Sequence, residues 1–193
     1  MSRLHLTLTV TAALLCLTLG TAHAALFTID AYANSSSGGV GVSTVSLGAG
    51  QSFSVSVDPN DLWNAGPLPR WSNADGLTHN VYATGSDDSG QPVGTLTGED
   101  FGLWTQDSFT APFGTLMGQI GSTWMKLGTS FSGTAPVAGT LKLFYWDVNN
   151  FDNTEHITAD VVTTPGSTPE LSTWLLLGCS GLAGVALRRR RRA

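Results

Sequence analysis

The sequence predicts an all-β protein, an antiparallel β-sandwich of short strands that lies between two targeting segments. Segment 51–57 alternates Phe53, Val55 and Val57 with serines, which is typical of a strand with one buried face. Segment 140–147 is apolar on both faces and therefore predicts a central strand. No segment combines a sustained helical period with caps. Short strands and glycine-rich turns together favour a sandwich.

The remaining strands follow from the same patterns in chain order. The full predicted set is 26–32, 40–47, 51–57, 114–120, 123–127, 140–147 and 155–162. Turn residues separate them at 48–50, 58–60, 121–122 and 135–136. Between Val42 and Val45 the apolar parity switches, which predicts a β-bulge. In the last strand the alternation directs Ile157 inward and His156 outward.

The N-terminus has the three parts of a secretory signal peptide. Arg3 lies in a short n-region, segment 6–19 is apolar, and Ala22-His23-Ala24 is a small-x-small cleavage site. We expect residues 1–24 to be removed during export. A retained N-terminal anchor is the alternative.

The C-terminus predicts a membrane anchor after a linker at 164–168. The apolar segment 171–187 has 17 residues, at the short end of what crosses a bilayer as a helix. Trp174 marks one boundary, and arginines at 188–192 form a cytoplasmic anchor at the other. The alternative is a buried core helix followed by a charged surface.

With Pro169 and Glu170 in front of this span, segment 169–193 resembles the PEP-CTERM sorting tail. The resemblance implies a Gram-negative bacterium, export across its inner membrane, and recognition by an exosortase-type processing enzyme. The protein would then be membrane-anchored, or on the cell surface or in the extracellular matrix after processing. Leu171 stands where the motif usually has proline.

The exported body is strongly acidic. Residues 25–168 contain three of the nine basic residues and thirteen of the fourteen acidic ones, which leaves a net charge of −10. Such a body is a poor partner for nucleic acid, whose phosphates need Lys and Arg. Both cysteines, Cys16 and Cys179, lie in the targeting segments, so the body at 25–163 has neither a disulfide nor a thiolate metal site.

Two segments of the body have the composition of a binding site. The long segment 58–102 combines Trp63 and Trp71 with polar residues that include Asp75 and His79. Aromatic rings stack on sugar faces, and carboxylate or amide oxygens accept sugar hydroxyl protons. The alternative is that the two tryptophans fasten this segment to the sandwich.

The second segment, 147–153, reads Asp-Val-Asn-Asn-Phe-Asp-Asn. Carboxylate, amide and carbonyl oxygens are the ligands that Ca²⁺ prefers, so a cation site is one interpretation. The spacing is not that of an EF-hand, and an ordinary Asx-turn hairpin is the other interpretation.

The body also resembles the calcium-dependent galactophilic lectin I family, small jelly-roll β-sandwiches. The segments that carry this resemblance are 28–34, 43–47, 50–55, 63–67, 111–121, 143–147 and 152–153. It implies calcium ligands from the side chains of Asp147, Asp152 and Asn153 and from main-chain carbonyls near Ala65 and Asn150. It further implies that Asp147 and Asp152 contact sugar; the other candidate contacts are Trp71, Asp75 and His79. The loop after Asp147 is shorter here than in that family.

Catalysis is not expected. Glu99-Asp100 and Asp87-Asp88 are adjacent carboxylates, which point to opposite faces of a strand rather than toward each other. We therefore expect a lectin-like surface protein that binds extracellular carbohydrate with the help of Ca²⁺. A structural or adhesive protein of the extracellular polysaccharide matrix, without a small ligand, is the second hypothesis. Binding of another protein at an exposed sheet edge is a third.

Overall fold

The computed structural model describes residues 22–164, and in this range the chain is built from β-strands and contains no helix. The fourteen strands are β1 His23–Asp30, β2 Val42–Leu47, β3 Ser52–Val57, β4 Trp63–Asn64, β5 Trp71–Ser72, β6 Val81–Tyr82, β7 Leu96–Gly98, β8 Leu103–Gln106, β9 Phe109–Pro112, β10 Leu116–Ile120, β11 Thr123–Lys126, β12 Ser130–Thr134, β13 Gly139–Tyr145 and β14 His156–Thr163. None of these residues forms a helix long and apolar enough to cross a bilayer. Residues 1–21 of the predicted signal peptide and the predicted tail, with Pro169, Glu170, 171–187 and 188–192, lie outside the described range.

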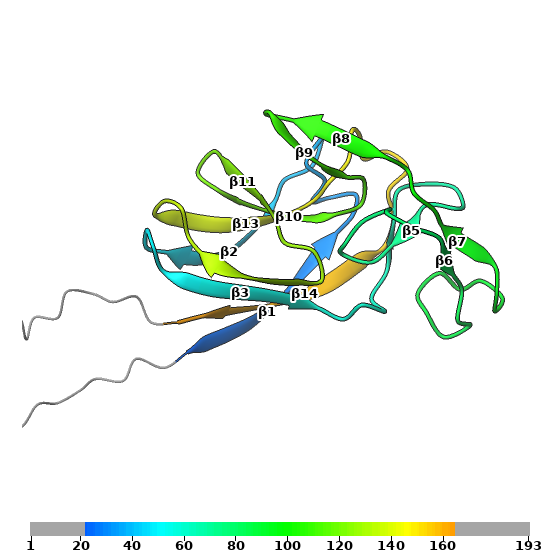
Figure 1. The fold of residues 1–193 in the computed structure, drawn as a ribbon, viewed down its shortest axis with the longest axis horizontal. Coiled ribbons are helices and arrows are strands. Elements are labelled where there is room, and N and C mark those ends of the chain that lie inside the picture. The colour runs from blue at the N-terminus through cyan, green and yellow to red at the C-terminus, as the bar shows by residue number, and fades with distance from the viewer. Residues whose placement is uncertain (1–21, 165–193) are drawn as a thin grey trace, which may run out of the picture.

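Two four-stranded antiparallel sheets face each other (Figure 1). One has the order β1-β14-β3-β12 and the other β11-β10-β13-β2. Along the chain, these eight strands change sheet at every step except between β10 and β11. Eight strands connected in this way in two sheets form a jelly roll. The predicted all-β sandwich is therefore confirmed, with β13 at the interior position that its apolar faces predicted.

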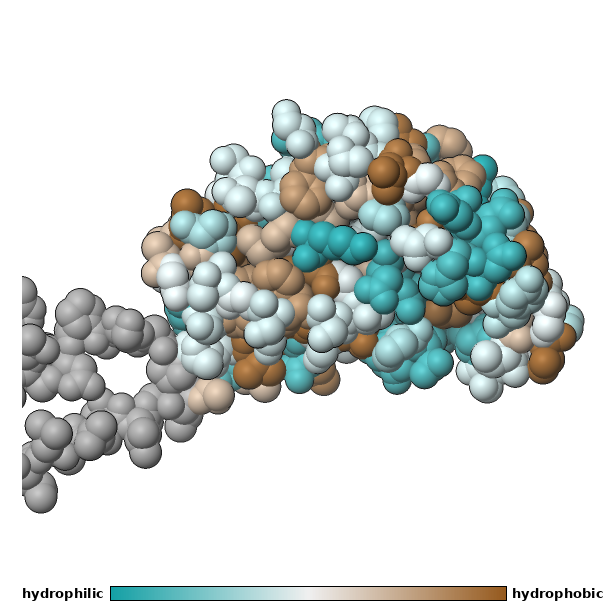
Figure 2. Space-filling model, viewed as in Figure 1, coloured by the Kyte–Doolittle hydropathy of each residue, from teal (hydrophilic) through white to brown (hydrophobic). Residues whose placement is uncertain are grey.

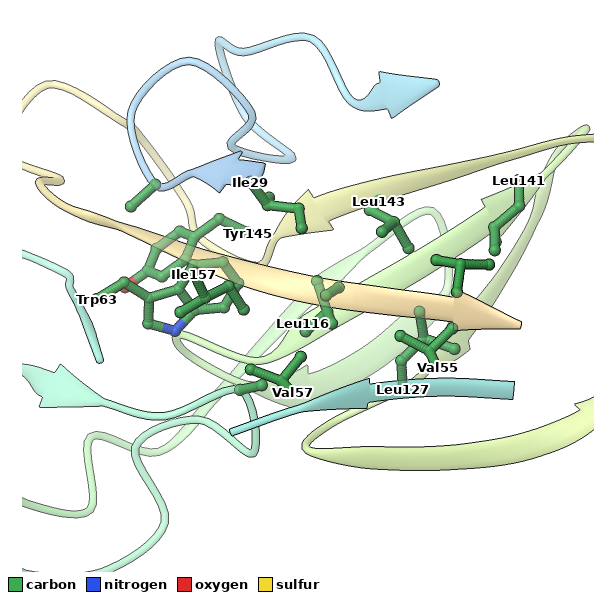
Figure 3. Close-up of a cluster of buried hydrophobic side chains, with 14 of the residues drawn as sticks. Ile29, Val55, Val57, Trp63, Leu116, Leu127, Leu141, Leu143, Tyr145 and Ile157 are labelled. Atoms are coloured by element: carbon green, nitrogen blue, oxygen red, sulfur yellow. The ribbon is translucent and has the colours of Figure 1, made fainter. Parts of the chain in front are cut away.

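The main core fills the space between the sheets, as Figure 3 shows. Alternate residues of β3 and β14, among them Val55 and Ile157, point into it, and His156 points outward. Leu116, Leu141 and Leu143 contribute from the opposite sheet. Complete burial of such a side chain stabilises the fold by about 1.5–3 kcal/mol.

The second face of β13 is covered by a hairpin that the sequence analysis did not predict. Strands β8 and β9 pair, and with Trp124 they enclose a smaller cluster around Phe144 and Trp146. The indole nitrogen of Trp146 donates a hydrogen bond to the Trp104 carbonyl at 3.1 Å. Both apolar faces of β13 thus have a partner.

The predicted bulge lies in β2. Ser46 pairs with Thr140 and Ser43 pairs with Lys142, so β2 carries one residue more than β13 between these pairs. The parity switch in the sequence reflects this extra residue. Strand β12 was not predicted because Phe131 is its one large apolar side chain, and serines and Gly133 leave no clear apolar–polar alternation.

The long segment 58–102 contains four very short strands. Trp63 is fully buried, its indole nitrogen donates to the Gly114 carbonyl at 2.9 Å, and its ring meets Tyr145 edge-on (Figure 3). Trp71 in β5 is only 8% exposed. The interpretation that these tryptophans fasten the segment to the sandwich fits this packing.

Strands β1 and β14 pair along their whole length, from His23 opposite Thr163 to Asp30 opposite His156. Residues 22 and 164 therefore lie at one end of the sandwich, and the loop before β14 lies at the other (Figure 1). Cleavage after Ala24, as predicted, would shorten β1 by its first two residues. β1 ends at Asp30, whose carboxylate accepts the backbone N–H groups of Tyr32 and Ala33 and starts a turn.

Candidate functional site

Three chain segments meet at the end of the sandwich opposite the termini. They are the loop 147–153 between β13 and β14, the β4–β5 hairpin, and the segment that follows β1. Asn64 in β4 exchanges two backbone hydrogen bonds with Thr154, at 3.0 and 3.1 Å, which places the hairpin beside the loop. On the face shown in Figure 2, hydrophilic side chains gather toward this end of the molecule.

Asp147 lies two residues after the end of β13 and is only 4% exposed. Its backbone is fixed by Ser36, whose hydroxyl donates to the Asp147 carbonyl at 3.1 Å and accepts from its N–H at 3.2 Å. The pKa of the carboxyl group is raised to about 6, chiefly by burial and in part by nearby Asp152, while hydrogen bonds from Val148, Asn153 and Asn149 limit the rise. No Lys or Arg in residues 22–164 forms an ion pair with it.

Asp152 lies across the loop, next to the β4–β5 hairpin. Its Oδ2 is 3.7 Å from a guanidinium nitrogen of Arg70. Gly66, at φ +118°, packs so closely on this carboxylate that a β-carbon would collide with it. The backbone N–H of Gly66 donates to the side-chain oxygen of Asn64. Glycine at 66 therefore permits both the backbone conformation and the close approach.

Asn153 is buried, 4% exposed, and uses its side-chain nitrogen for two hydrogen bonds, to the carbonyls of Ala31 at 3.1 Å and Asn149 at 3.2 Å. Its side-chain oxygen has no donor. The side-chain oxygen of Asn149 and the hydroxyl of Tyr145 are also buried without a partner. Burial raises the pKa of Tyr145 well above its usual range, and Asp147 and Asp152 add to the effect. Two of the five unpartnered buried atoms in the described residues, those of Asn149 and Asn153, thus belong to the 147–153 loop, whereas Tyr145 is part of the main core.

The two predicted carbonyl ligands lie on the same two segments. The carbonyl of Ala65 accepts a hydrogen bond from Arg70 at 3.5 Å. The carbonyl of Asn150 accepts from the Asn153 N–H at 3.2 Å, and the Asn150 side chain donates to the Tyr32 carbonyl at 3.0 Å. No group of three or more His, Cys, Asp or Glu side chains suited to a metal occurs between residues 22 and 164. The oxygens here come instead from two carboxylates, amides and the main chain.

The three other sugar-contact candidates are placed differently. Trp71 belongs to the β4–β5 hairpin but leaves little of its ring in solvent. The carboxylate of Asp75 accepts from the Thr129 N–H at 2.8 Å and the Thr129 hydroxyl at 2.9 Å, and so fixes the turn before β12. His79 is exposed, and its Nδ1 lies 2.9 Å from the Thr78 hydroxyl. None of these contacts reaches Asp147 or Asp152.

Three residues that the sequence analysis did not single out border the site. Phe151 lies on the loop itself and is 78% exposed. The Arg70 guanidinium lies over the ring of Phe101, 4.4 Å from its centroid. Arg70 is the single basic residue in 58–102, and Phe151 is the single aromatic in 147–153. Both facts are visible in the sequence, but their spatial relation to Asp152 is not.

No protein-family model matches the sequence, and no curated protein matches it either. Among solved structures, the N-terminal domain of EclA, described as a PllA-like lectin, is similar to this chain. The two share 20% sequence identity with a TM-score of 0.44, over 72% of this chain and 94% of that one. A similarity at this level establishes neither a family nor a ligand.

Proposed function

We propose that this protein is an exported surface protein whose jelly roll binds extracellular carbohydrate with the help of Ca²⁺. The observation that carries the proposal is the oxygen-rich site around Asp147. Two neighbouring carboxylates and two buried amide oxygens without hydrogen-bond donors, those of Asn149 and Asn153, belong to one loop there. Buried polar atoms are rarely left without partners, so this group calls for an explanation.

These residues fit a hard divalent cation. Ca²⁺ takes six to eight oxygen ligands in flexible geometry, about 2.3–2.6 Å away. Asp147, Asp152 and Asn153 would hold it with side-chain oxygens, and Ala65 and Asn150 with carbonyls. When bound, the ion supplies positive charge and free coordination positions for hydroxyl groups.

The protein's own residues supply the remaining parts of a sugar site. Deprotonated Asp147 and Asp152 accept hydrogen bonds from hydroxyl groups. The exposed ring of Phe151 provides an apolar face on the same loop, which suits stacking on a pyranose. It takes the role that the sequence analysis gave to Trp71.

Calcium dependence is tested by melting the purified full-length protein with chelator and with excess Ca²⁺. An ion that binds only the folded state, at a free concentration 100 times its Kd, adds about 2.7 kcal/mol to the free energy of unfolding, or roughly 10 °C in Tm. Asp152→Asn should abolish the shift, and Glu99→Gln, which removes an exposed carboxylate, should not. Equal melting temperatures with and without Ca²⁺ in the parent protein would contradict the proposal.

Carbohydrate binding is tested separately on a glycan array, with Ca²⁺ and with chelator. Signals that require Ca²⁺ and disappear in Asp152→Asn support a lectin. An array without signal, from protein that does bind Ca²⁺, leaves the ion as a purely structural element.

One observation favours the second candidate, a structural or adhesive matrix protein without a small ligand. The guanidinium group of Arg70 lies 3.7 Å from the Asp152 carboxylate and gives it a counter-charge from the protein itself. For such a protein the melting curve is indifferent to chelator and the glycan array is blank.

Anchoring and processing are proposed from the termini alone. Mass spectrometry of protein recovered from the producing cells distinguishes an intact tail from one cut near Pro169-Glu170. If an exosortase-type enzyme acts here, replacing both motif residues by alanine should cause the form that retains the terminal arginines to accumulate in the membrane fraction. Equal processing of the parent protein and the double-alanine variant would rule out a role for the motif.

A further inference from the structure

Arg70 lies among the oxygen atoms that the proposed function assigns to Ca²⁺. One guanidinium nitrogen is 3.7 Å from Oδ2 of Asp152 and 3.5 Å from the Ala65 carbonyl oxygen. Those are two of the five proposed ligands. A positively charged group of the protein thus already contacts part of the ligand set.

Two further contacts hold the guanidinium in this place. Its central carbon lies 4.4 Å from the centroid of the Phe101 ring, a cation–π distance. The backbone carbonyl of Arg70 accepts the Ala65 N–H at 3.0 Å, which fixes the base of the side chain within the β4–β5 hairpin. The Arg70 side chain is therefore held in place at its guanidinium group and at its backbone, and it points toward Asp152.

The charge balance of the site depends on this contact. Arg70 forms the sole salt bridge between residues 22 and 164, and its partner is one of the two carboxylates of the site. The guanidinium group of arginine carries a positive charge. Without it, the two neighbouring carboxylates would have no Lys or Arg of residues 22–164 within salt-bridge distance.

We propose that Arg70 is the resident counter-ion of the site and sets its affinity for divalent cations. Binding of Ca²⁺ requires the guanidinium to leave Asp152 and the Ala65 carbonyl. The protein then exchanges an internal cation for an external one, which weakens ion binding and keeps the ion-free fold intact. This inference rests on the proposed function, because it concerns the same ligand set.

The test compares Arg70→Gln with Lys142→Gln. Both remove one positive charge, but Lys142 points outward from the middle of β13. For each full-length protein, calorimetry gives the Kd for Ca²⁺, and a melt in chelator gives the ion-free stability. We expect Arg70→Gln to bind Ca²⁺ about 10-fold more tightly than the parent, which is about 1.4 kcal/mol of binding free energy. That is the size of the contacts that Arg70 gives up when the ion binds, a partly exposed ion pair and a cation–π contact. Its ion-free Tm should fall, and Lys142→Gln should match the parent in both measurements.

Arg70→Lys provides a second variant that keeps the charge but lacks the planar fork. We expect a Kd between those of the parent and Arg70→Gln. If Ca²⁺ binds the parent and Arg70→Gln equally well, the counter-ion role is refuted and the proposed function stands. If Ca²⁺ binds neither the parent nor the variants, both are refuted. If Arg70→Gln binds Ca²⁺ more weakly, Arg70 supports ion binding and the inference is wrong.

Discussion

In ion-free buffer, Asp147→Asn should make the protein more stable at neutral pH and its stability less dependent on pH. Asp147 is buried without a basic partner, so folding disfavours its charged form. Asparagine keeps a side-chain oxygen that can accept the Val148 N–H, which the Asp147 carboxylate now accepts at 2.6 Å. The substitution removes the charge with little change in shape.

The magnitude follows from the pKa of about 6 in the folded protein and the ordinary value of 3.8 in an unfolded chain. A carboxyl group whose pKa is raised on folding contributes stability that is fully present below pH 3.8. That contribution is lost as the pH rises through 6, because the unfolded chain releases its proton first. At roughly 1.4 kcal/mol per pKa unit, the loss by pH 7 is about 3 kcal/mol, or about 10 °C in Tm.

Thermal melts of both proteins in chelator, from pH 4 to pH 8, measure this directly. The Tm of the parent should fall relative to that of Asp147→Asn across this range. Other titrating groups, such as Asp61, whose pKa burial also raises, are present in both proteins and cancel in the difference. Ca²⁺ at about 1,000 times its Kd adds about 4.1 kcal/mol to the parent, more than this loss, and should reverse the ranking at pH 7. Parallel profiles for the two proteins would show that Asp147 titrates normally.

Three further substitutions probe the surroundings of the site. Trp63→Phe removes the hydrogen bond to Gly114 and part of a buried ring. It should lower the free energy of unfolding, measured with denaturant, by about 2–4 kcal/mol. A decrease below about 0.5 kcal/mol would show that this contact is unimportant. Gly66→Ala should destabilise the fold by about 1–3 kcal/mol and weaken Ca²⁺ binding, since the added β-carbon displaces the Asp152 carboxylate. An unchanged Kd for Ca²⁺ would argue against the close contact between residue 66 and Asp152. Phe151→Ala should alter stability by less than about 0.5 kcal/mol yet weaken glycan-array signals, and undiminished signals would remove Phe151 from the sugar site.

The strands that the sequence predicted well are those with one buried face. In 51–57 and 155–162 the alternation alone gave the inward residues, and in 40–47 a parity switch gave the bulge. The β8–β9 hairpin was missed because its strands are short and each buries few side chains. Its existence was nevertheless implied by Phe144 and Trp146, which need a cover on the outer face of β13.

The candidate site was only partly predictable for a related reason. The loop 147–153 is local, so its oxygens could be counted in the sequence. Arg70 and Phe101 are distant in sequence from Asp152. No local pattern predicts that the β4–β5 hairpin, which carries Arg70, will lie beside the 147–153 loop. Trp71 and Asp75 have the composition of a sugar site, but composition does not separate a ring that stacks on a ligand from one that packs inside.

The pairing of β1 with β14 places the described ends of the chain at one pole of the molecule and the 147–153 loop at the other. In a protein tethered by its C-terminus, a pull on a ligand in this loop travels along β14. That strand lies between β1 and β3, and its hydrogen bonds to both are nearly perpendicular to its axis. The part of the pull that enters through the neighbouring β4–β5 hairpin, instead of through the backbone of β14 itself, loads these bonds in shear, all at once and not one by one.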